Sequence, residues 1–240
     1  MSDALVIIPT YNEIENIVSI ISAVFSQSKD FNVLIVDDNS PDKTGNKVRE
    51  LQEVFKDQLF LLERTEKSGL GTAYIAGFKW ALENDYQYIF EMDADFSHNP
   101  NDLIKLYEAC AKNGADISVG SRYVRGITVV NWPLSRILLS YGASRYVRFI
   151  TRMKVKDSTA GFVCYKRKVL ETINLNKVKF VGYAFQIEMK FKAHKKGFKI
   201  VEIPVIFKDR TKGNSKMSGS IISEAIFGVV SLKLTSLFAK

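Results

Sequence analysis

The chain has 240 residues, of which 46% are hydrophobic and 25% are charged, and its formal net charge is +8. This balance indicates a globular protein with a sizeable core and excludes an intrinsically disordered chain. The basic charge suits an anionic partner. The lysines and arginines are dispersed and mixed with acids, however, which argues against a nucleic-acid-binding protein.

The cysteines and the N-terminal sequence indicate the cellular compartment of the protein. Cys110 and Cys164 lie far apart and outside any metal-binding spacing, so buried, reduced thiols in a cytosolic protein are expected. No apolar run approaches the roughly 18 to 20 residues of a membrane-spanning helix. The N-terminus also lacks the basic start of a signal peptide. We therefore expect a cytoplasmic protein, either soluble or peripherally associated with the cytoplasmic face of a membrane.

The first half of the chain alternates strand-like and helix-like segments. Strands are predicted at residues 5–9, 33–36, 59–63, 88–92 and 117–120, and helices at residues 13–25, 44–55, 70–84 and 100–113. This alternation predicts a Rossmann-like α/β fold, in which helices flank a mostly parallel sheet. Ligands of such sheets bind beyond the carboxyl ends of the strands.

The second half is less regular but contains no repeat or linker, so a single domain over residues 1–240 is expected. Strands are predicted at residues 161–166 and 199–207, on either side of a helix at residues 184–196. Residues 131–153 and 219–238 have the spacing of amphipathic helices and are candidate membrane-facing segments. Packing against the domain is the alternative for the second of them.

The motif Asp93-Ala94-Asp95 carries the most chemical information. It directly follows the apolar run at residues 88–92, so both acids lie where a buried strand ends. Side chains at i and i+2 point the same way along an extended backbone, which would aim both acids at one point. Two carboxylates that close are costly unless a proton or cation intervenes, and a hard divalent cation would also hold phosphate oxygens.

Three other segments permit more than one interpretation. Residues 10–13 have the spacing of a helix capping box, or they line a base and ribose pocket. Asp37 and Asp38 fit an ordinary turn or ligands of ribose hydroxyls. The glycines at 69 and 71 do not form a dinucleotide fingerprint, because Tyr74 holds the third glycine position. We expect them to permit a tight turn and close helix packing.

Arginines and a basic loop supply candidate phosphate contacts. Arg122 and Arg136 lie on either side of Trp132 in the sequence, and Arg210 and Lys216 lie in a polar loop at residues 208–218. A planar guanidinium is well suited to phosphate, and a basic loop can close over a diphosphate. Solvated surface positions are the alternative for each of these residues.

Together these stretches resemble glycosyltransferase family 2, which has the GT-A fold, and within it the dolichol-phosphate (polyprenol-phosphate) mannose synthases. The resemblance extends over most of the chain. Its early motifs are common to much of the family, and its later ones are more specific to lipid-phosphate mannosyltransferases. The matching stretches are residues 8–13, 36–42, 67–73, 92–100, 120–123, 157–162, 182–188 and 209–216.

The resemblance implies a role for each candidate residue on the donor side. Asp93 and Asp95 would hold the Mg2+ or Mn2+ that bridges the donor diphosphate, with Ala94 in backbone contact. Ser97 stands where some members have glutamine. Two residues would bind the donor diphosphate as the loop closes, namely Arg210 and Lys216. The nucleoside pocket would be lined by Pro9, Tyr11, Glu13, Val36 and Asp38.

On the acceptor side, the resemblance assigns a phosphate to Arg122, Arg136 and Ser140. Asp157 is the best carboxylate candidate outside the metal pair, and we expect it to orient the sugar or the acceptor. A structural cap is the alternative for Asp157. The residues expected to be catalytic are therefore Asp93, Asp95, Arg122 and Asp157.

The implied reaction transfers mannose from GDP-mannose to a polyprenyl (dolichyl) monophosphate, with inversion and with a divalent metal. The implied partners are this donor and acceptor, a membrane surface and a membrane partner subunit, without nucleic acid. Two alternatives stay open. One is a polyprenyl-phosphate glucosyltransferase that uses UDP-glucose, and the other is a non-catalytic nucleotide-sugar-binding protein.

Overall fold

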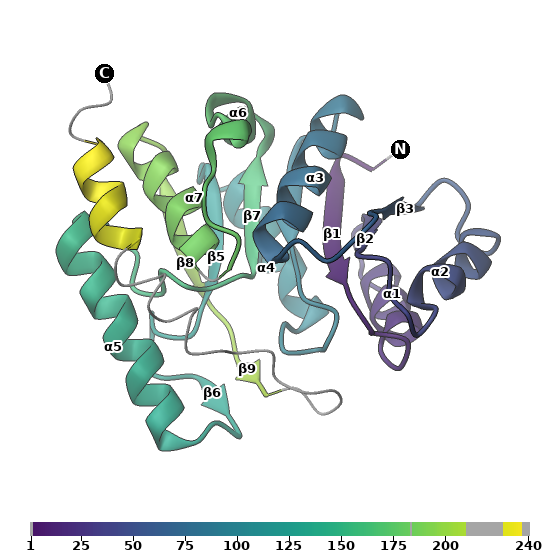
Figure 1. The fold of residues 1–240 in the computed structure, drawn as a ribbon, viewed down its shortest axis with the longest axis horizontal. Helices are drawn as coiled ribbons and strands as arrows, with labels where there is room; N and C mark the ends of the chain where they lie inside the picture. Colours follow the sequence, from purple (N-terminus) through teal and green to yellow (C-terminus); the bar gives the residue numbers. More distant parts are fainter. Residues whose placement is uncertain (1, 183, 210–227, 237–240) are drawn as a thin grey trace.

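A seven-stranded sheet forms the centre of the computed structural model, which describes residues 2–182, 184–209 and 228–236 (Figure 1). The strand order is β3-β2-β1-β4-β7-β5-β8. β7 runs antiparallel to β4 and β5, and every other neighbouring pair is parallel, which confirms the predicted mostly parallel sheet. The strands are β1 (Ala4–Thr10), β2 (Asn32–Asp37), β3 (Leu59–Glu63), β4 (Tyr88–Glu91), β5 (Ile117–Ser121), β7 (Val163–Lys166) and β8 (Ile200–Pro204).

Helices cover both faces of this sheet, and the alternation of side chains along β1 shows how. Val6 and Ile8 belong to the core beneath α1 (Ile17–Phe25), α2 (Thr44–Gln52) and α4 (Leu103–Ala111). Leu5 and Ile7 belong to the core on the opposite face. That core is covered by α3 (Leu70–Glu83), α6 (Arg167–Thr172) and α7 (Ala184–Lys195). A strand buried on both faces explains why β1 is apolar without interruption.

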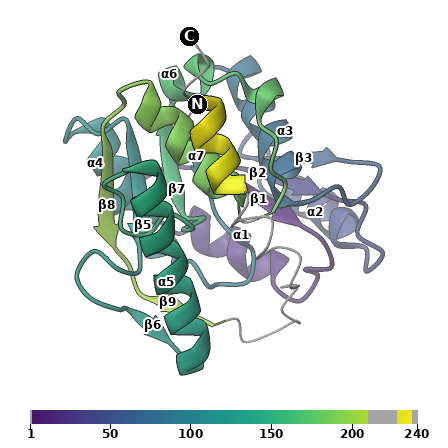
Figure 2. The same cartoon turned by 60° about the vertical axis from the view of Figure 1, so that its left-hand side comes forward.

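The long helix α5 (Leu134–Thr151) lies at one side of the molecule, beside α7 and the helical residues 228–236 (Figures 1 and 2). Val147 of α5, Ile187 of α7 and Val229 share a small third core. Beside the lower half of α5 in Figure 1, β6 (Val129–Val130) pairs with β9 (Phe207–Lys208). Among the described residues, no helix is both long enough and apolar enough to cross a bilayer.

Two helix starts differ from the expectations. The helix predicted at residues 13–25 begins at Ile17, and the capping-box interpretation of residues 10–13 is wrong. The Glu13 backbone N–H, which a capping box would pair with the Thr10 side chain, donates instead to Thr44 Oγ1 at 3.1 Å, and the Thr10 hydroxyl donates to Asp37 Oδ1 at 2.8 Å. The helix predicted at residues 100–113 begins with a 3-10 turn, η1 (Pro100–Asp102), before α4. A second 3-10 turn, η2 (Leu175–Lys177), follows α6.

The glycines at the start of α3 have the predicted structural role. Gly69 has a φ of +101°, which L-residues with a side chain rarely adopt. A Cβ at Gly71 would lie 2.8 Å from the Phe180 carbonyl oxygen and 2.9 Å from the Phe185 ring. The helix therefore approaches the segment before α7 so closely that only glycine fits at position 71.

Gly71→Ala will lower the free energy of unfolding by about 1 to 3 kcal/mol, because an overpacked core must shift its backbone or rotamers. Gly142→Ala is the control, since a Cβ at Gly142 in α5 meets nothing within 4 Å. That change should stabilise the protein by up to about 1 kcal/mol, through the helix preference for alanine. Urea unfolding of both variants measures this, and equal midpoints would contradict the close packing.

Candidate functional site

The acid motif lies in a turn immediately beyond the end of β4. β4 ends at Glu91, and Asp95 belongs to a turn, so the two acids are not on one extended strand as the i, i+2 argument assumed. The turn continues through Phe96 with a φ of +60°. Asp93 and Asp95 nevertheless line the same cavity, which has a volume of about 500 Å³. Both acids therefore face one cavity, as expected, but a turn brings them there and not an extended strand.

Neighbouring groups hold the two acids in place. The Tyr74 hydroxyl lies 3.4 Å from Asp93 Oδ1, and the Ser97 backbone N–H donates to Asp95 Oδ1 at 3.0 Å. The Asp93 backbone N–H donates to His98 Nδ1 at 3.1 Å. His98 is buried and stacks on Phe162, with ring centroids 4.9 Å apart, and this burial lowers its pKa. His98 is therefore a buried residue that supports the motif.

The donor set at this turn fits a small hard cation. Asp93 and Asp95 supply carboxylates, and the buried Ser97 hydroxyl beside them has no hydrogen-bond partner in the structure. No group of three or more histidine, cysteine, aspartate or glutamate side chains that could hold a metal occurs in the described part of the chain. A pair of carboxylates is the arrangement that Mg2+ favours, because that ion uses one or two carboxylates and completes its shell with water and substrate phosphate.

The five candidate nucleoside residues gather at the ends of β1 and β2. Pro9 and Val36 are register partners in the parallel pair, and the Asp38 backbone N–H donates to Thr10 O at 3.0 Å. Asp38 pairs with Arg64 at 3.0 Å, and its burial raises its pKa. Tyr11 lies under the Lys67 ammonium at 4.4 Å.

Asp37 and Glu13, at the same two strand ends, make hydrogen bonds within the protein. Asp37 accepts hydrogen bonds from Thr10 and from Ser40, so this acid serves the turn. Glu13 accepts from Asn16 Nδ2 at 2.9 Å. The residues that line the 500 Å³ cavity do not include the five nucleoside candidates, which form a neighbouring cluster at the same edge of the sheet.

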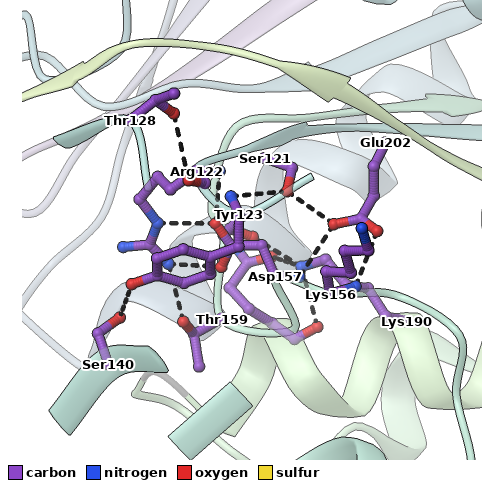
Figure 3. Close-up of polar contacts among 12 residues, drawn as sticks. Ser121, Arg122, Tyr123, Thr128, Ser140, Lys156, Asp157, Thr159, Lys190 and Glu202 are labelled. Carbon is purple, nitrogen blue, oxygen red and sulfur yellow. Dashed lines mark hydrogen bonds and ion pairs between the residues drawn. The ribbon is translucent and has the colours of Figure 1, made fainter. Parts of the chain in front are cut away.

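Arg122 and Asp157 form a buried ion pair (Figure 3). Arg122 Nε donates to Asp157 Oδ2 at 2.7 Å, and Arg122 Nη2 donates to Asp157 Oδ1 at 2.6 Å. The Arg122 backbone N–H also donates to Oδ2, at 2.9 Å, and Asp157 has no exposed surface. Arg122 lines the cavity and donates to Thr159 Oγ1 as well. Asp157 therefore holds Arg122, and its oxygens do not face the cavity.

Arg136 and Ser140 occupy the first turns of α5, on the same cavity. The Arg136 guanidinium stacks on the Trp132 ring at 4.0 Å and donates to Asp209. Ser140 Oγ accepts from the buried Tyr123 hydroxyl at 2.8 Å (Figure 3). The structure thus brings the three candidate acceptor residues onto the cavity that the acid pair lines. Arg210 and Lys216 lie outside the described residues.

Two buried charges, Glu91 and Lys190, lie behind the cavity wall and are linked through Gln186, which lines the cavity. Gln186 Nε2 donates to Glu91 Oε2, and Lys190 Nζ donates to Gln186 Oε1 at 3.1 Å and to Ala160 O at 2.6 Å. Burial raises the pKa of Glu91 to about 7 and lowers the pKa of Lys190 to about 8. Lys190 thereby ties α7 to the segment that carries Thr159. The residue spacing offered no signal for this set.

The rest of the cavity wall is apolar and comes mainly from the second half of the chain. The sequence indicated α5 as an amphipathic helix but gave no sign that its inner side would close a site with strand ends. The apolar lining residues include Leu138, Leu139, Ala143, Tyr146, Val147, Ile187, Val205 and Phe207. A ligand that fills this cavity presents an anionic part to the arginines and an apolar part to α5.

Residues 5–173 match the family described as Glycosyl transferase family 2. The chain belongs to glycosyltransferase family 2. The resemblance inferred from the sequence motifs is therefore confirmed at the level of the family, and the protein is a glycosyltransferase with the α/β architecture that was expected.

Named relatives of this family 2 glycosyltransferase are similar over almost the whole chain. It is 48% identical to polyprenol monophosphomannose synthase of Mycolicibacterium smegmatis, over 94% of this chain and 84% of that protein. It is 43% identical to undecaprenyl-phosphate mannosyltransferase of Micrococcus luteus, over 94% and 91%. It is 40% identical to dolichol-phosphate mannosyltransferase of Pyrococcus furiosus, over 91% of this chain and 60% of that protein.

A solved structure shares the fold at low sequence identity. A mannosyltransferase of Pyrobaculum calidifontis in complex with GDP-Man and Mn2+ superposes with a TM-score of 0.60 at 17% identity. The match covers 98% of this chain and 74% of that one. This likeness supports the GT-A fold expected for a family 2 glycosyltransferase.

Asp157→Asn will lower the free energy of unfolding of this glycosyltransferase by about 3 to 5 kcal/mol, because it leaves a buried guanidinium without its counter-ion. Asp209→Asn is the matched control, since the Arg136–Asp209 pair is partly exposed, and it should cost about 1 kcal/mol at most. Urea unfolding followed by tryptophan fluorescence compares the two. A smaller loss for Asp157→Asn than for Asp209→Asn would contradict the assigned burial.

Proposed function

We propose that this protein transfers mannose from GDP-mannose to a polyprenyl monophosphate, with inversion at the anomeric carbon. The observation that carries the proposal is one cavity lined both by the acid pair Asp93 and Asp95 and by Arg122 and Arg136, with an apolar wall from α5. Such a cavity suits a phosphorylated donor beside a phosphorylated lipid. Three relatives that are 40% to 48% identical bear names of enzymes that mannosylate such lipids.

On the donor side, the proposal places the nucleoside at the ends of β1 and β2. The cluster of Pro9, Tyr11, Glu13, Val36 and Asp38 lies at the edge of the sheet where ligands of parallel α/β sheets bind. Asp93 and Asp95, with Ser97 beside them, would hold Mg2+ or Mn2+ against the diphosphate. When bound, the ion supplies Lewis-acid stabilisation of the departing diphosphate. Arg210 and Lys216 are proposed to add positive charge there.

On the acceptor side, the lipid phosphate is proposed to contact Arg122, Arg136 and Ser140. Asp157 would act through Arg122, because both of its oxygens are engaged by that guanidinium and none faces the cavity. Asp157 is therefore proposed as a positioning residue. This role is narrower than the direct contact with sugar or acceptor expected from the sequence.

The proposed chemistry balances without a general base. An oxygen of the acceptor phosphate forms a bond to the anomeric carbon of mannose, and the bond from that carbon to the donor diphosphate breaks. The electron pair leaves with the diphosphate. A phosphate monoester has a second pKa of about 6, so the acceptor is largely a dianion at neutral pH and attacks without losing a proton. The product is a phosphodiester with one negative charge.

Transfer of label from GDP-mannose into an organic phase, with a short prenyl phosphate as acceptor, tests the proposal. We expect transfer that requires Mg2+ or Mn2+ and that falls about a hundredfold or more in Asp95→Ala, since the metal contributes several kcal/mol. Asp30→Ala, an exposed acid before β2, is the control and should transfer normally. Normal turnover by Asp95→Ala would remove the metal assignment.

Two other outcomes of this assay separate the alternatives. Transfer from UDP-glucose but not from GDP-mannose would identify a glucosyltransferase. Tight binding of GDP-mannose with no transfer to any prenyl phosphate would identify a nucleotide-sugar-binding protein. Either result would replace the proposed function.

The exposed face of α5 is proposed to rest on an anionic membrane surface. Leu134 and Phe149 are 69% and 83% exposed, and Arg145 lies exposed between them. The sequence contains no aspartate or glutamate from residue 117 to residue 156 but seven lysines and arginines in that range beyond Arg122. An apolar face with a basic rim is typical of an interfacial helix.

The helical residues 228–236 are a weaker candidate for membrane contact. They bury Val229 and Leu232 against α5 and α7, as expected from the packing alternative. The cytoplasmic face and a membrane partner subunit stay predictions from the sequence.

The combined change Leu134→Ser, Arg145→Glu and Phe149→Ser will release the protein from vesicles that contain phosphatidylglycerol. Each large apolar side chain contributes about 1.5 to 3 kcal/mol when buried, and each basic residue about 1 kcal/mol at an anionic surface. Co-sedimentation should therefore fall by more than about tenfold. Val54→Ser, which alters an exposed apolar residue after α2 on the far side of the molecule, is the control (Figure 1). Unchanged sedimentation of the triple variant would contradict the membrane-facing role of α5.

A further inference from the structure

One ion pair in the cavity wall engages a residue that is proposed to bind the acceptor. Arg136 Nη1 lies 3.0 Å from both carboxylate oxygens of Asp209, and both residues line the cavity. Their side chains are 25% and 28% exposed. Solvent and ligand therefore reach this pair. Asp209 has no role in the function proposed above.

Both partners are held by the same small framework. Arg136 lies in the first turn of α5, and its guanidinium stacks on the Trp132 ring at 4.0 Å. The Asp209 backbone N–H donates to Val130 O at 3.1 Å, directly after β9, and β9 pairs with β6. Asp209 is thus presented to Arg136 by backbone pairing, so the contact is part of the fold.

The two arginine pairs of the cavity differ in how easily a ligand can replace the carboxylate. Asp157 is fully buried and accepts three hydrogen bonds from Arg122, so that pair is permanent. The Asp209 carboxylate contacts Nη1 of Arg136 in a partly exposed site. Solvent weakens an ion pair that it reaches, and fully exposed pairs are held by about 1 kcal/mol or less. An incoming anion can displace Asp209 but not Asp157.

A phosphate and a carboxylate compete for a guanidinium on similar terms, because each presents two oxygens to its N–H groups. A lipid phosphate that contacts Arg136 must therefore displace Asp209 or share Arg136 with it. The acceptor monoester carries two negative charges, whereas the product diester carries one. The product is consequently the weaker competitor against a carboxylate that is tethered beside Arg136 at high effective concentration.

We propose that Asp209 is an internal anion that competes with the lipid phosphate for Arg136 and thereby limits the affinity of the site for both acceptor and product. The carboxylate occupies Arg136 when the site is empty, yields to the dianionic acceptor, and returns when transfer has reduced the charge of the lipid phosphate. This proposal rests on the proposed assignment of the lipid phosphate to Arg136.

Asp209→Asn tests the competition, because it removes the charge and keeps the shape and the backbone hydrogen bond. We expect the dissociation constants of a short prenyl phosphate and of its mannosyl phosphodiester both to fall, by about two- to fivefold. Titration of tryptophan fluorescence in a Trp80→Phe background, which leaves Trp132 beside Arg136 as the reporter, measures both constants. The inhibition constant of the product should fall by the same factor.

Two controls make the result specific. Asp85→Asn makes the same change of charge at a side chain that is 91% exposed and remote from the cavity, and it should leave both constants unchanged. In an Arg136→Gln background, Asp209→Asn should have no further effect, because the competed group is gone.

Opposite or absent effects would overturn the proposal. Weaker binding in Asp209→Asn would mean that Asp209 orients Arg136 for the ligand, and unchanged constants would mean that the two anions do not compete. If Arg136→Gln alone leaves the affinity for prenyl phosphate unchanged, the phosphate does not bind at Arg136 and the proposal fails. Failure of the proposed function itself would appear separately, as absence of mannosyl transfer by the unaltered protein.

Discussion

The parallel pairing of β1 with β2 on one side and β4 on the other is the constraint on which the site depends. Parallel neighbours end at the same edge of a sheet, so the residues after these three strands meet there. β1 is buried on both faces, and its alternate side chains belong to two different cores. A slip of one residue would exchange these faces, so packing holds the register that places Asp38 and Asp93 at one edge.

The antiparallel strand β7 completes the site from the other half of the chain. Val163 at its start pairs with Glu91 at the end of β4, so the segment before β7 lies at the edge where the parallel strands end. That segment carries Asp157, which pairs with Arg122 just beyond the end of β5. A strand of reversed direction thus brings a carboxylate from residues 157–162 to an arginine 35 residues earlier.

Burial divides the charges around the cavity into fixed and exchangeable groups. Glu91 and Lys190 are buried behind the wall, and Arg122 and Asp157 are buried within it, so removing one partner leaves an uncompensated charge. The Arg136–Asp209 pair is partly exposed and therefore exchangeable. Under the proposed function this division matters for a lipid phosphate, because such a ligand must enter, react and leave through the same space.

The sequence by itself determined the strand and helix alternation, the acid motif at a strand end and the candidate arginines, because these depend on local spacing and residue type. It missed the start of α1 and the buried role of His98, since Thr10 bonds to Asp37 and His98 stacks on Phe162, both distant in the chain. It also missed the turn at Asp95, which a local hydrogen bond from the Ser97 backbone N–H accompanies. Only the tertiary structure decided which carboxylate each arginine faces. Arg122 pairs with Asp157, 35 residues away, and Arg136 pairs with Asp209, 73 residues away. No local pattern encodes these pairs, because they depend on where β7 and β9 join their sheets.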